Sequence, residues 1–499
     1  MPQRPVNVVL VLADDLGWGD LSCYGATRIQ TPHLDRLAAE GISFHDAHAA
    51  SAVCTPSRYA ILTGRYSWRS PLKHGVLMGH GPALIEPGRP TLGSVFKTHG
   101  YRTAAIGKWH LGLGWKHRDG STWDAFRGDP LEYELGDPLA RHRDKDLDFG
   151  AGIDYAQPFT GGPVDLGFDY FFGIAGSLNM PPYALLAQNR TVGLPQQEKR
   201  RFLPGQRPGY ETPDWDEREV DLRFTGEAVR FIERSAGLPF LLYFAPSAPH
   251  RPQVPPDFLR GVSDAGPRGD SVVFVDWMVG QLTEALERAG VLDDTLIVFT
   301  SDNGAPTIFA DEVDLEVHRP NGPWRGQKGD LWDGGHREPL IARLPGVVPA
   351  GTTSPARFGL IDLLPSIAGL LDVPLPAGAA PDGVDRSGRL TGAPGTPDDL
   401  LVHHSMGGAF AVTRGRWKAL FSPGSGGGLS DPESDLLGPD DPSGQLFDVE
   451  DDPGEQRNVW TEHSDVVHDL YRELIRIVGG DADLDPGGRT AHPDQRRTA

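Results

Sequence analysis

Two short runs of residues constrain the fold of this 499-residue chain more than any other feature. Val6–Leu12 and Thr295–Thr300 are mainly apolar and rich in β-branched residues, as in strands that are covered on both faces of a parallel sheet. Acidic and amide side chains follow each run directly, at Asp14–Asp15 and at Asp302–Asn303. Because ligands of open α/β sheets bind at the carboxyl ends of the strands, we expect these side chains to share one edge of a sheet.

Helical and strand-like segments alternate along most of the chain. Caps and apolar spacing predict helices from Pro32 to Gly41, over Thr91–His99, over Phe224–Ser235 and from Phe274 to Gly290, and strands at Ile42–Phe44, Tyr101–Ile106 and Phe240–Phe244. This alternation predicts a large, mainly parallel mixed sheet sandwiched between helices. Periodicity is poor between Trp115 and Pro213, where we expect long loops over the sheet edge that shape a substrate pocket.

The C-terminal part has a different pattern. Short strands are expected at Leu400–His404, Ala409–Thr413 and Trp417–Phe421, followed by an amphipathic helix that Ser464 caps. A chain of this length exceeds one ordinary core. We therefore expect a catalytic α/β domain over 1–375, a linker or crossover over 376–399, a smaller antiparallel sheet with one helix over 400–480, and a disordered tail over 481–499.

The charge and the cysteine content exclude several classes of protein. A formal net charge of −21 argues against a nucleic-acid partner or an anionic membrane, so an anionic substrate would need a local cluster of cations. Cys23 and Cys54 are the only cysteines, so no disulfide framework is expected. No run approaches the length of a membrane span, and no cleavage site follows the first apolar run, which predicts a cytoplasmic protein. The oligomeric state is left open.

One cysteine occupies a place suited to an anion. In the segment Cys54-Thr-Pro56-Ser-Arg58, the proline indicates a helix start, and the helix is expected to end at Gly64. Cys54 would then lie just before a helix N-terminus, where unpaired N–H groups favour negative charge. Arg58, one turn further on, adds a permanent cation. The alternative is a buried free thiol that packs as a small apolar residue.

The side chains at the two strand ends form a possible metal site. Their oxygens suit Ca²⁺ or Mg²⁺ rather than zinc, which prefers histidine or cysteine ligands. A turn or a hairpin is the alternative for each pair, since Asp-Asp before glycine and Asn-Gly are common in turns. The candidate ligands are Asp14, Asp15, Asp302 and Asn303.

Several segments together resemble the type I sulfatases, the formylglycine-dependent, arylsulfatase-like branch of the alkaline phosphatase superfamily. The Cys54 segment matches the family signature C-x-P-x-R, and the two metal pairs match D-D-x-G and D-N-G. Further similar segments, in the family's order, are Gly107-Lys108-Trp109-His110-Leu111-Gly112, Pro249-His250, Gln327-Lys328-Gly329, Arg337-Glu338-Pro339 and Asp452-Pro453-Gly454-Glu455 through Asn458. The resemblance extends from Asn7 to about Val459.

The resemblance implies a sulfatase that hydrolyses aryl or carbohydrate sulfate monoesters. Cys54 would be oxidised to formylglycine by a formylglycine-generating enzyme, and one Ca²⁺ (or Mg²⁺) per chain would lie on Asp14, Asp15, Asp302, Asn303 and the modified Cys54. Arg58 and Lys108 would orient the formylglycine hydrate, and His250 and Lys328 would bind sulfate and assist the departing alcohol. His110 would be the base that releases sulfate. The substrate would be a small-molecule or saccharide sulfate ester, and the source is expected to be bacterial.

Other functions remain open at this point. A phosphonate monoester or phosphodiester hydrolase of the same superfamily can share C-x-P-x-R, and a non-catalytic sulfate-ester binding protein would keep Cys54 unmodified. Taken singly, each lysine or histidine could be an ordinary surface or capped residue. Trp18, Trp109, Trp115 and Trp324 could stack on a sugar or aryl ring, or could pack in the core.

Overall fold

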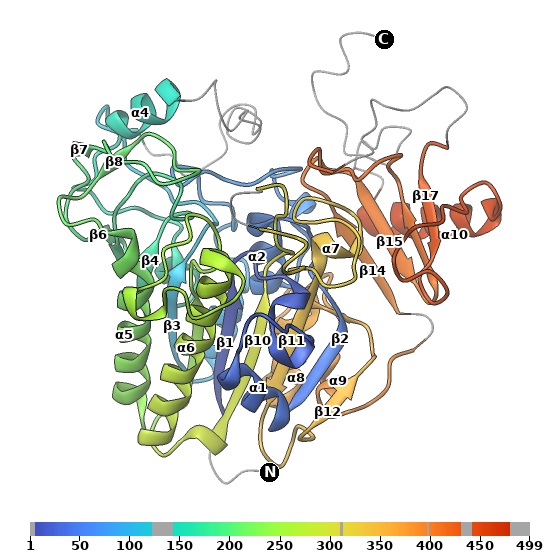
Figure 1. Cartoon of the computed structure of the whole chain (residues 1–499). Coiled ribbons are helices and arrows are strands. Elements are labelled where there is room, and N and C mark those ends of the chain that lie inside the picture. The colour runs from blue at the N-terminus through green and yellow to red at the C-terminus, as the bar shows by residue number, and fades with distance from the viewer. Residues whose placement is uncertain (1–4, 122–142, 310–312, 397–398, 431–441, 480–499) are drawn as a thin grey trace.

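The computed structural model describes residues 5–121, 143–309, 313–396, 399–430 and 442–479, and an 11-stranded sheet forms its main body (Figure 1). Across this sheet the strands are β12 (Thr352–Ser354), β2 (Ile42–His48), β11 (Arg337–Arg343), β10 (Thr295–Ser301), β1 (Asn7–Ala13), β9 (Phe240–Ala245), β3 (Arg102–Lys108), β4 (Tyr170–Ile174), β5 (Leu186–Ala187) and β6 (Arg190–Thr191), and β13 (Phe358–Gly359) pairs with β2.

The middle of the sheet is parallel. β10, β1, β9, β3 and β4 run in the same direction, whereas β11 is antiparallel to both β10 and β2. The register pairs Ala13 with Ser301, so the residues that follow β1 and β10 emerge side by side. The prediction of a mainly parallel mixed sheet is confirmed.

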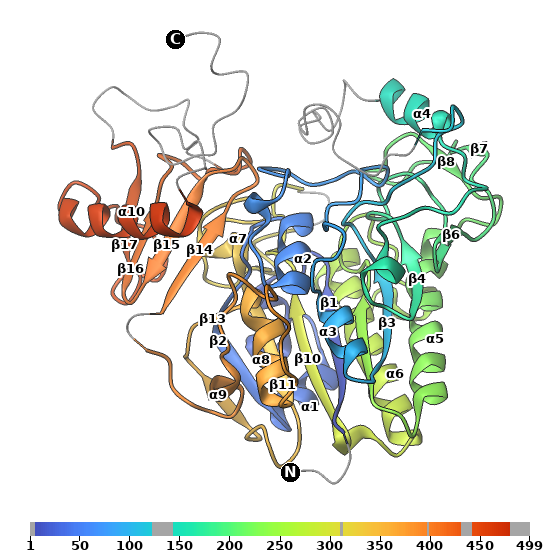
Figure 2. The same cartoon turned by 180° about the vertical axis from the view of Figure 1, so that it is seen from behind.

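Helices cover both faces of this sheet. Figure 1 shows α1 (Pro32–Ala39), α5 (Glu217–Ser235) and α6 (Gly266–Arg288) on one face, and Figure 2 shows α2 (Cys54–Thr63), α3 (Leu92–Thr98) and α8 (Leu363–Leu370) on the other. In β1, Val8, Leu10 and Leu12 belong to the core beneath α2, α3 and α8, while Val9 and Val11 belong to the core beneath α1, α5 and α6. Burial on both faces explains why this strand is almost continuously apolar.

A second, smaller sheet lies beside the first. Its antiparallel strands are β14 (Leu400–His404), β15 (Phe410–Arg414), β16 (Trp417–Leu420) and β17 (Gln445–Asp448), and α10 (Ser464–Val478) packs Leu470 and Leu474 into its core. This arrangement confirms the expected antiparallel sheet with one helix. Of the short helices, α7 (Asp333–His336) immediately precedes β11, and α9 (Ser387–Leu390) packs against α8 and buries Leu390 in the main core. The domain limits stay a prediction, and the expected tail over 481–499 lies outside the described residues.

The expectation of loops between Trp115 and Pro213 is wrong in part. β4 extends the parallel sheet beside β3, and the same region contains α4 (Arg143–Gly152) and the hairpin of β7 (Gln197–Glu198) with β8 (Tyr210–Glu211). β4 lacks a continuous buried run, because Tyr170 and Phe172 stay partly exposed on either side of the buried Phe171. A short strand of this kind leaves a weak signal in the sequence.

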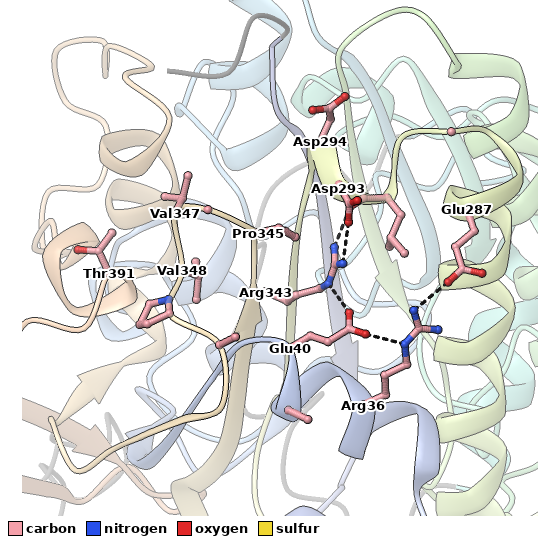
Figure 3. A pocket seen from close by; sticks show the side chains of 16 residues that line it. Arg36, Glu40, Glu287, Asp293, Asp294, Arg343, Pro345, Val347, Val348 and Thr391 are labelled. Carbon is pink, nitrogen blue, oxygen red and sulfur yellow. Dashed lines mark hydrogen bonds and ion pairs between the residues drawn. The ribbon is translucent and has the colours of Figure 1, made fainter.

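A cavity of about 1110 Å³ lies next to the start of β10 and the end of β11, at the amino ends of the parallel strands. Figure 3 shows the side chains that line it. Arg36 is bound by Glu40 and Glu287, and Arg343 is bound by Glu40 and Asp293. Since both guanidinium groups are already paired, neither is offered to an anionic ligand in this cavity. None of the described helices is both long and apolar enough to cross a membrane.

Candidate active site

Two strand ends bring the predicted oxygen ligands together. Asp14 and Asp15 follow β1, Asp302 and Asn303 follow β10, and all four side chains are buried. Asp15 has a left-handed backbone with φ of 63°, which aspartate tolerates better than most residues. Its N–H donates to Asp302 Oδ1 at 3.2 Å, so the two strand ends are tied directly to each other.

Buried cations face these carboxylates. Lys108, the last residue of β3, places Nζ 2.8 and 2.7 Å from the two carboxylate oxygens of Asp14. Arg58 of α2 places Nε 2.9 Å from Asp302 Oδ2, and its Nη2 lies 2.7 Å from the same oxygen and 3.3 Å from Asp14 Oδ1. These charges have no access to solvent, so their mutual pairing is required for them to remain buried.

Cys54 and Lys328 meet at the centre of the site. Cys54 is the first residue of α2 and not the residue before it, so its side chain still lies at the helix N-terminus. Its Sγ is 3.6 Å from Asp14 Oδ1 and 3.4 Å from Lys328 Nζ. Lys328 in turn binds both carboxylate oxygens of Asp15, at 2.7 and 2.9 Å. Burial raises the pKa of the Cys54 thiol to about 12, so the unmodified residue is a neutral thiol.

The buried charges shift the pKa values of Asp15 and Asp302 in opposite directions. Burial alone would raise the pKa of Asp15, but Lys328, His250 and Lys108 together hold that pKa well below its usual range. For Asp302 burial outweighs the attraction of Arg58, and the pKa of this carboxyl is raised. Burial would lower the pKa of Lys328, yet the Asp15 carboxylate raises it, so the ammonium stays charged.

The two predicted histidines lie beside this cluster. His250 follows the loop after β9, donates from Nδ1 to the carbonyl oxygen of Arg251 at 2.6 Å, and has Nε2 3.7 Å from Asp15 Oδ2. His110 donates from Nε2 to the carbonyl oxygen of Leu77 at 2.6 Å, while its buried Nδ1 has no hydrogen-bond partner among the described residues. Burial lowers the pKa of His250 to about 3 and that of His110 well below its usual value, so both imidazoles are neutral.

The donor set fits a hard divalent cation. Ligand atoms of Asp14, Asp15, Cys54 and Asp302 all lie within 4.8 Å of one another. Asn303 donates from Nδ2 to Asp15 Oδ1 at 2.7 Å, while its buried Oδ1 has no hydrogen-bond partner within the described ranges. A buried amide oxygen without a partner beside three carboxylates suits Ca²⁺ or Mg²⁺, which take oxygen ligands.

Two supporting residues were not singled out from the sequence. Arg268 of α6 binds both carboxylate oxygens of Asp20, at 2.7 and 2.6 Å, and donates to the carbonyl oxygen of Asp15 at 3.0 Å. Asp221 of α5 accepts from the backbone N–H groups of Ser247 and Ala248, at 2.8 and 3.0 Å, ahead of His250. No local signal marks either role, because α5 has many charged residues and both Asp221 and Arg268 precede the helix starts expected at Phe224 and Phe274.

Of the four candidate tryptophans, two lie in the core and two form an edge-to-face pair. Trp109 and Trp115 are each 1% exposed and pack in the main core, which excludes them from stacking on a ligand. Trp18 and Trp324 contact each other edge to face with ring centroids 5.6 Å apart, and the guanidinium of Arg337 lies 3.7 Å over the Trp324 ring.

The fold and the site together define an alkaline phosphatase-like hydrolase of anionic esters: carboxylates, cations and a helix N-terminus converge at the carboxyl edge of a mainly parallel sheet. The family model for sulfatases matches residues 6–373, and the chain belongs to the sulfatase family. It is therefore a sulfuric ester hydrolase.

Known relatives agree with this assignment over most of the chain. The N-acetylgalactosamine-6-O-sulfatase of Bacteroides thetaiotaomicron is 32% identical and covers 95% of this chain and 93% of its own length. Arylsulfatase A of Homo sapiens is 34% identical and covers 91% of this chain and 83% of its own length. A solved structure from work on glycosaminoglycan metabolism by Bacteroides thetaiotaomicron superposes with a TM-score of 0.79 at 30% identity, covering 96% of this chain and 100% of that chain.

Proposed function

We propose that this sulfatase hydrolyses sulfate monoesters of saccharides with a formylglycine made from Cys54 and one bound Ca²⁺. The observation that carries the proposal is the position of Cys54. It lies at a helix N-terminus, with Lys328 Nζ 3.4 Å and Asp14 Oδ1 3.6 Å from its Sγ. A neutral thiol with a pKa near 12 is a poor nucleophile, so the arrangement favours a different group at this position.

Asp14, Asp15, Asp302 and Asn303 would hold the metal ion together with the modified residue 54. When bound, Ca²⁺ supplies positive charge that polarises the sulfate and favours the ionised nucleophile. Mg²⁺ is a possible substitute, since it prefers the same oxygen ligands.

Residue 54 would supply the nucleophile once it is modified. A formylglycine-generating enzyme would oxidise Cβ of Cys54 to an aldehyde with loss of the sulfur, using an external oxidant. The hydrated aldehyde offers one hydroxyl to attack sulfur and a second one to expel sulfate and restore the aldehyde. Over one cycle, water and the ester give the alcohol, sulfate and a proton.

The buried cations would orient the reacting groups. Arg58 and Lys108 lie on Asp302 and Asp14, where they can also donate hydrogen bonds to the hydrate at residue 54. Lys328 extends from Asp15 to Sγ of Cys54, so its ammonium can bind a sulfate oxygen and follow the charge that develops on the leaving oxygen.

The histidines would move protons. Nε2 of His250 carries the lone pair, since Nδ1 donates to a carbonyl, and it can take up a proton and pass it to the departing alcohol. His110 presents a free Nδ1, and its other nitrogen is held by the carbonyl of Leu77. This geometry suits a base that removes a proton when sulfate is released.

A sulfated saccharide is the proposed substrate class. The support is the relative named as an N-acetylgalactosamine-6-O-sulfatase, which matches nearly the whole chain. An aryl sulfate is the second test substrate, because another relative is named arylsulfatase A. An aryl phosphonate serves as the third, because it tests the phosphonate hydrolase alternative.

The test combines mass spectrometry with kinetics. Protein co-produced with a formylglycine-generating enzyme should yield a Cys54 peptide whose mass corresponds to the aldehyde, and it should hydrolyse N-acetylgalactosamine 6-sulfate. Cys54→Ala should reduce turnover to background. Aldehyde at residue 54 without hydrolysis of any sulfate ester would refute the proposed function, and a preference for aryl phosphonate would assign the alternative one.

A further inference from the structure

Gln327, the residue before the catalytic Lys328, has a buried side chain whose amide is fully hydrogen-bonded. Its Oε1 accepts from the backbone N–H groups of Thr307 and Ile308, at 2.6 and 3.0 Å. Its Nε2 donates to Ser430 Oγ at 2.9 Å and to the carbonyl oxygen of Leu429 at 3.4 Å. Both lone pairs and both N–H groups are thus in use, which only an amide allows.

Asp330 closes the same arrangement into a turn. Its Oδ2 accepts from the backbone N–H of Gln327 at 3.0 Å and from Ser430 Oγ at 2.6 Å, and its own N–H donates to the carbonyl oxygen of Gln327 at 3.0 Å. Lys328 occupies the second position of this turn. Ser430, which belongs to the C-terminal half of the chain, therefore contacts both ends of the turn that carries the lysine.

The backbone of the turn is also tied to the Cys54 segment. The N–H of Gly329 donates to the carbonyl oxygen of Ala52 at 2.8 Å, two residues before Cys54. The carbonyl oxygen of Gly329 accepts from the N–H of Met406, between β14 and β15, at 3.0 Å. The distance between Lys328 and Cys54 thus depends on the hydrogen bonds that Gly329 makes with Ala52 and with Met406.

We propose that Gln327 is a positioning residue for Lys328, and that it acts by joining the segment after β10 to the C-terminal subdomain through Ser430. A lysine side chain has many rotamers, so its ammonium stays on Asp15 and near Cys54 only if the backbone beneath it is held. This inference rests on the proposed function, which gives Lys328 its role in the reaction.

Three variants separate the parts of this arrangement. Gln327→Leu removes every hydrogen bond of the side chain. Gln327→Glu keeps the volume and the oxygen that accepts from Thr307 and Ile308, but it loses the donors to Ser430 and Leu429. Ser430→Ala removes the partner on the C-terminal side. Ser464→Ala is the matched control, because Ser464 is exposed and is the first residue of α10, whose N-cap is His463 and not Ser464 as the sequence predicted.

Steady-state kinetics of the matured enzyme should show a loss in kcat. We expect Gln327→Leu to lower kcat by about 10- to 100-fold, because small displacements of a catalytic group cost this much. The KM should change by less than about threefold, since Lys328 acts mainly on the developing charge of the leaving group. Gln327→Glu and Ser430→Ala should show smaller losses, and the control should equal the wild type.

A double-mutant cycle with Lys328→Ala distinguishes positioning from general support of the fold. If Gln327 acts through Lys328, Gln327→Leu should cause little further loss in kcat in the Lys328→Ala background. A loss of the same factor in both backgrounds would overturn the inference. So would an unchanged kcat in Gln327→Leu.

Hydrogen exchange of the full chain gives a measurement that is independent of activity. In Gln327→Leu, peptides covering 305–309 and 325–331 should exchange faster than in the wild type, while the control variant should not change. Unchanged exchange would refute the turn as a structural clamp. A wild-type enzyme that carries the aldehyde yet hydrolyses no sulfate ester would instead refute the proposed function, and with it the catalytic consequence of the clamp.

Discussion

Two groups of buried side chains bring possible metal ligands within 4.8 Å of one another, and they are built on different principles. The first contains Asp14, Asp15, Cys54 and Asp302 at the carboxyl edge of the main sheet, and the second contains His48, His336 and His403 between the two sheets. The acidic group has hard oxygen donors and an amide oxygen on Asn303 without a partner in the described part of the chain, whereas the histidine group offers imidazole nitrogens, all but Nε2 of His403 already hydrogen-bonded.

His336 and His48 form a hydrogen-bonded chain that ends on the Asp46 carboxylate, while Nδ1 of His403 bonds to the carbonyl oxygen of Ala49. Lys418 Nζ lies 3.2 Å from His336 Nε2, the Nδ1 atoms of His336 and His48 are 3.1 Å apart, and His48 Nε2 is 2.8 Å from Asp46 Oδ1. Lys418 already supplies a positive charge to this group. The rings of His336 and His403 are stacked, with centroids 3.8 Å apart and planes 13° from parallel. The two rings therefore cannot both point a nitrogen at the same ion.

Short distances between possible ligands do not by themselves make a metal site. Each group has one buried polar atom without a partner among the described residues, an amide oxygen on Asn303 and an imidazole nitrogen, Nε2, on His403. What separates the groups is the chemistry of their donors. Buried cations lie beside both groups, Lys418 beside the histidines and Lys108, Lys328 and Arg58 beside the carboxylates. The difference therefore lies in the donors, because the acidic group offers carboxylate oxygens and the Asn303 amide oxygen, which suit Ca²⁺.

The largest expected effect comes from removing the metal. Chelation of the matured enzyme by EGTA should lower kcat/KM by at least about 100-fold, because a metal ion contributes several kcal/mol to charge stabilisation. Added Ca²⁺ should restore the activity, and elemental analysis should find one calcium per chain. If the wild type instead binds zinc, and His48→Gln abolishes that binding, then the histidine group and not the acidic group is the metal site.

Breaking the acidic group should also destabilise the fold. Asp302→Asn leaves the fully buried Arg58 without its nearest carboxylate, which should cost about 3–5 kcal/mol of unfolding free energy along with nearly all activity. His48→Gln is the matched change in the other group. It should cost about 1–3 kcal/mol, from the lost hydrogen bonds to Asp46 and His336, while activity stays within about threefold.

Urea unfolding followed by far-ultraviolet circular dichroism measures both variants. Equal losses of activity in Asp302→Asn and His48→Gln would mean that the histidine group takes part in the reaction. Equal stability of Asp302→Asn and the wild type would mean that Arg58 does not depend on this carboxylate.

The smallest expected effect is a difference in the pH range over which the two groups change the stability of the fold. Burial lowers the pKa of His48, even though Asp46 and Asp333 act against the shift, and it lowers the pKa of His336 and His403 well below the usual value. A histidine with a lowered folded-state pKa contributes its full stability above pH 6.5 and loses it as the pH falls below that value. Below pH 6.5, each such histidine should lower the free energy of unfolding by up to about 1.4 kcal/mol per pH unit.

Asp15 responds in a different pH window. Its pKa is lowered on folding, so its contribution is present above the ordinary aspartate value of 3.8 and is lost only as the pH falls below it. Unfolding free energies at pH 7, 6 and 5 should therefore decline less steeply in His48→Gln than in the wild type. Identical slopes in the two proteins would show that His48 keeps an ordinary pKa in the folded state.

Much of the fold and of the candidate site could be predicted from short-range patterns. Apolar runs identified β1 and β10, and their parallel register alone brings Asp14 next to Asp302. The helix start at Cys54 followed from local signals within one turn. β4 could not be predicted, because partial exposure of alternate residues removed the apolar run that marks a buried strand.

Contacts across long sequence separations could not be predicted. Gln327 and Ser430 are 103 residues apart, and Arg268 reaches Asp15 across 253 residues. Neither pair has a local signal, because each depends on how the helices and the second sheet pack against the first.

The sequence by itself determined which chemical groups this sulfatase has and at which strand and helix ends they stand, because periodicity, caps and turn residues act over a few positions. Only the tertiary structure decided which of its two buried clusters has an oxygen left for a metal, and which distant residues hold Lys328 in place. The reason is physical: hydrogen-bond satisfaction and burial belong to atoms that meet in space, and chain order alone does not specify those meetings.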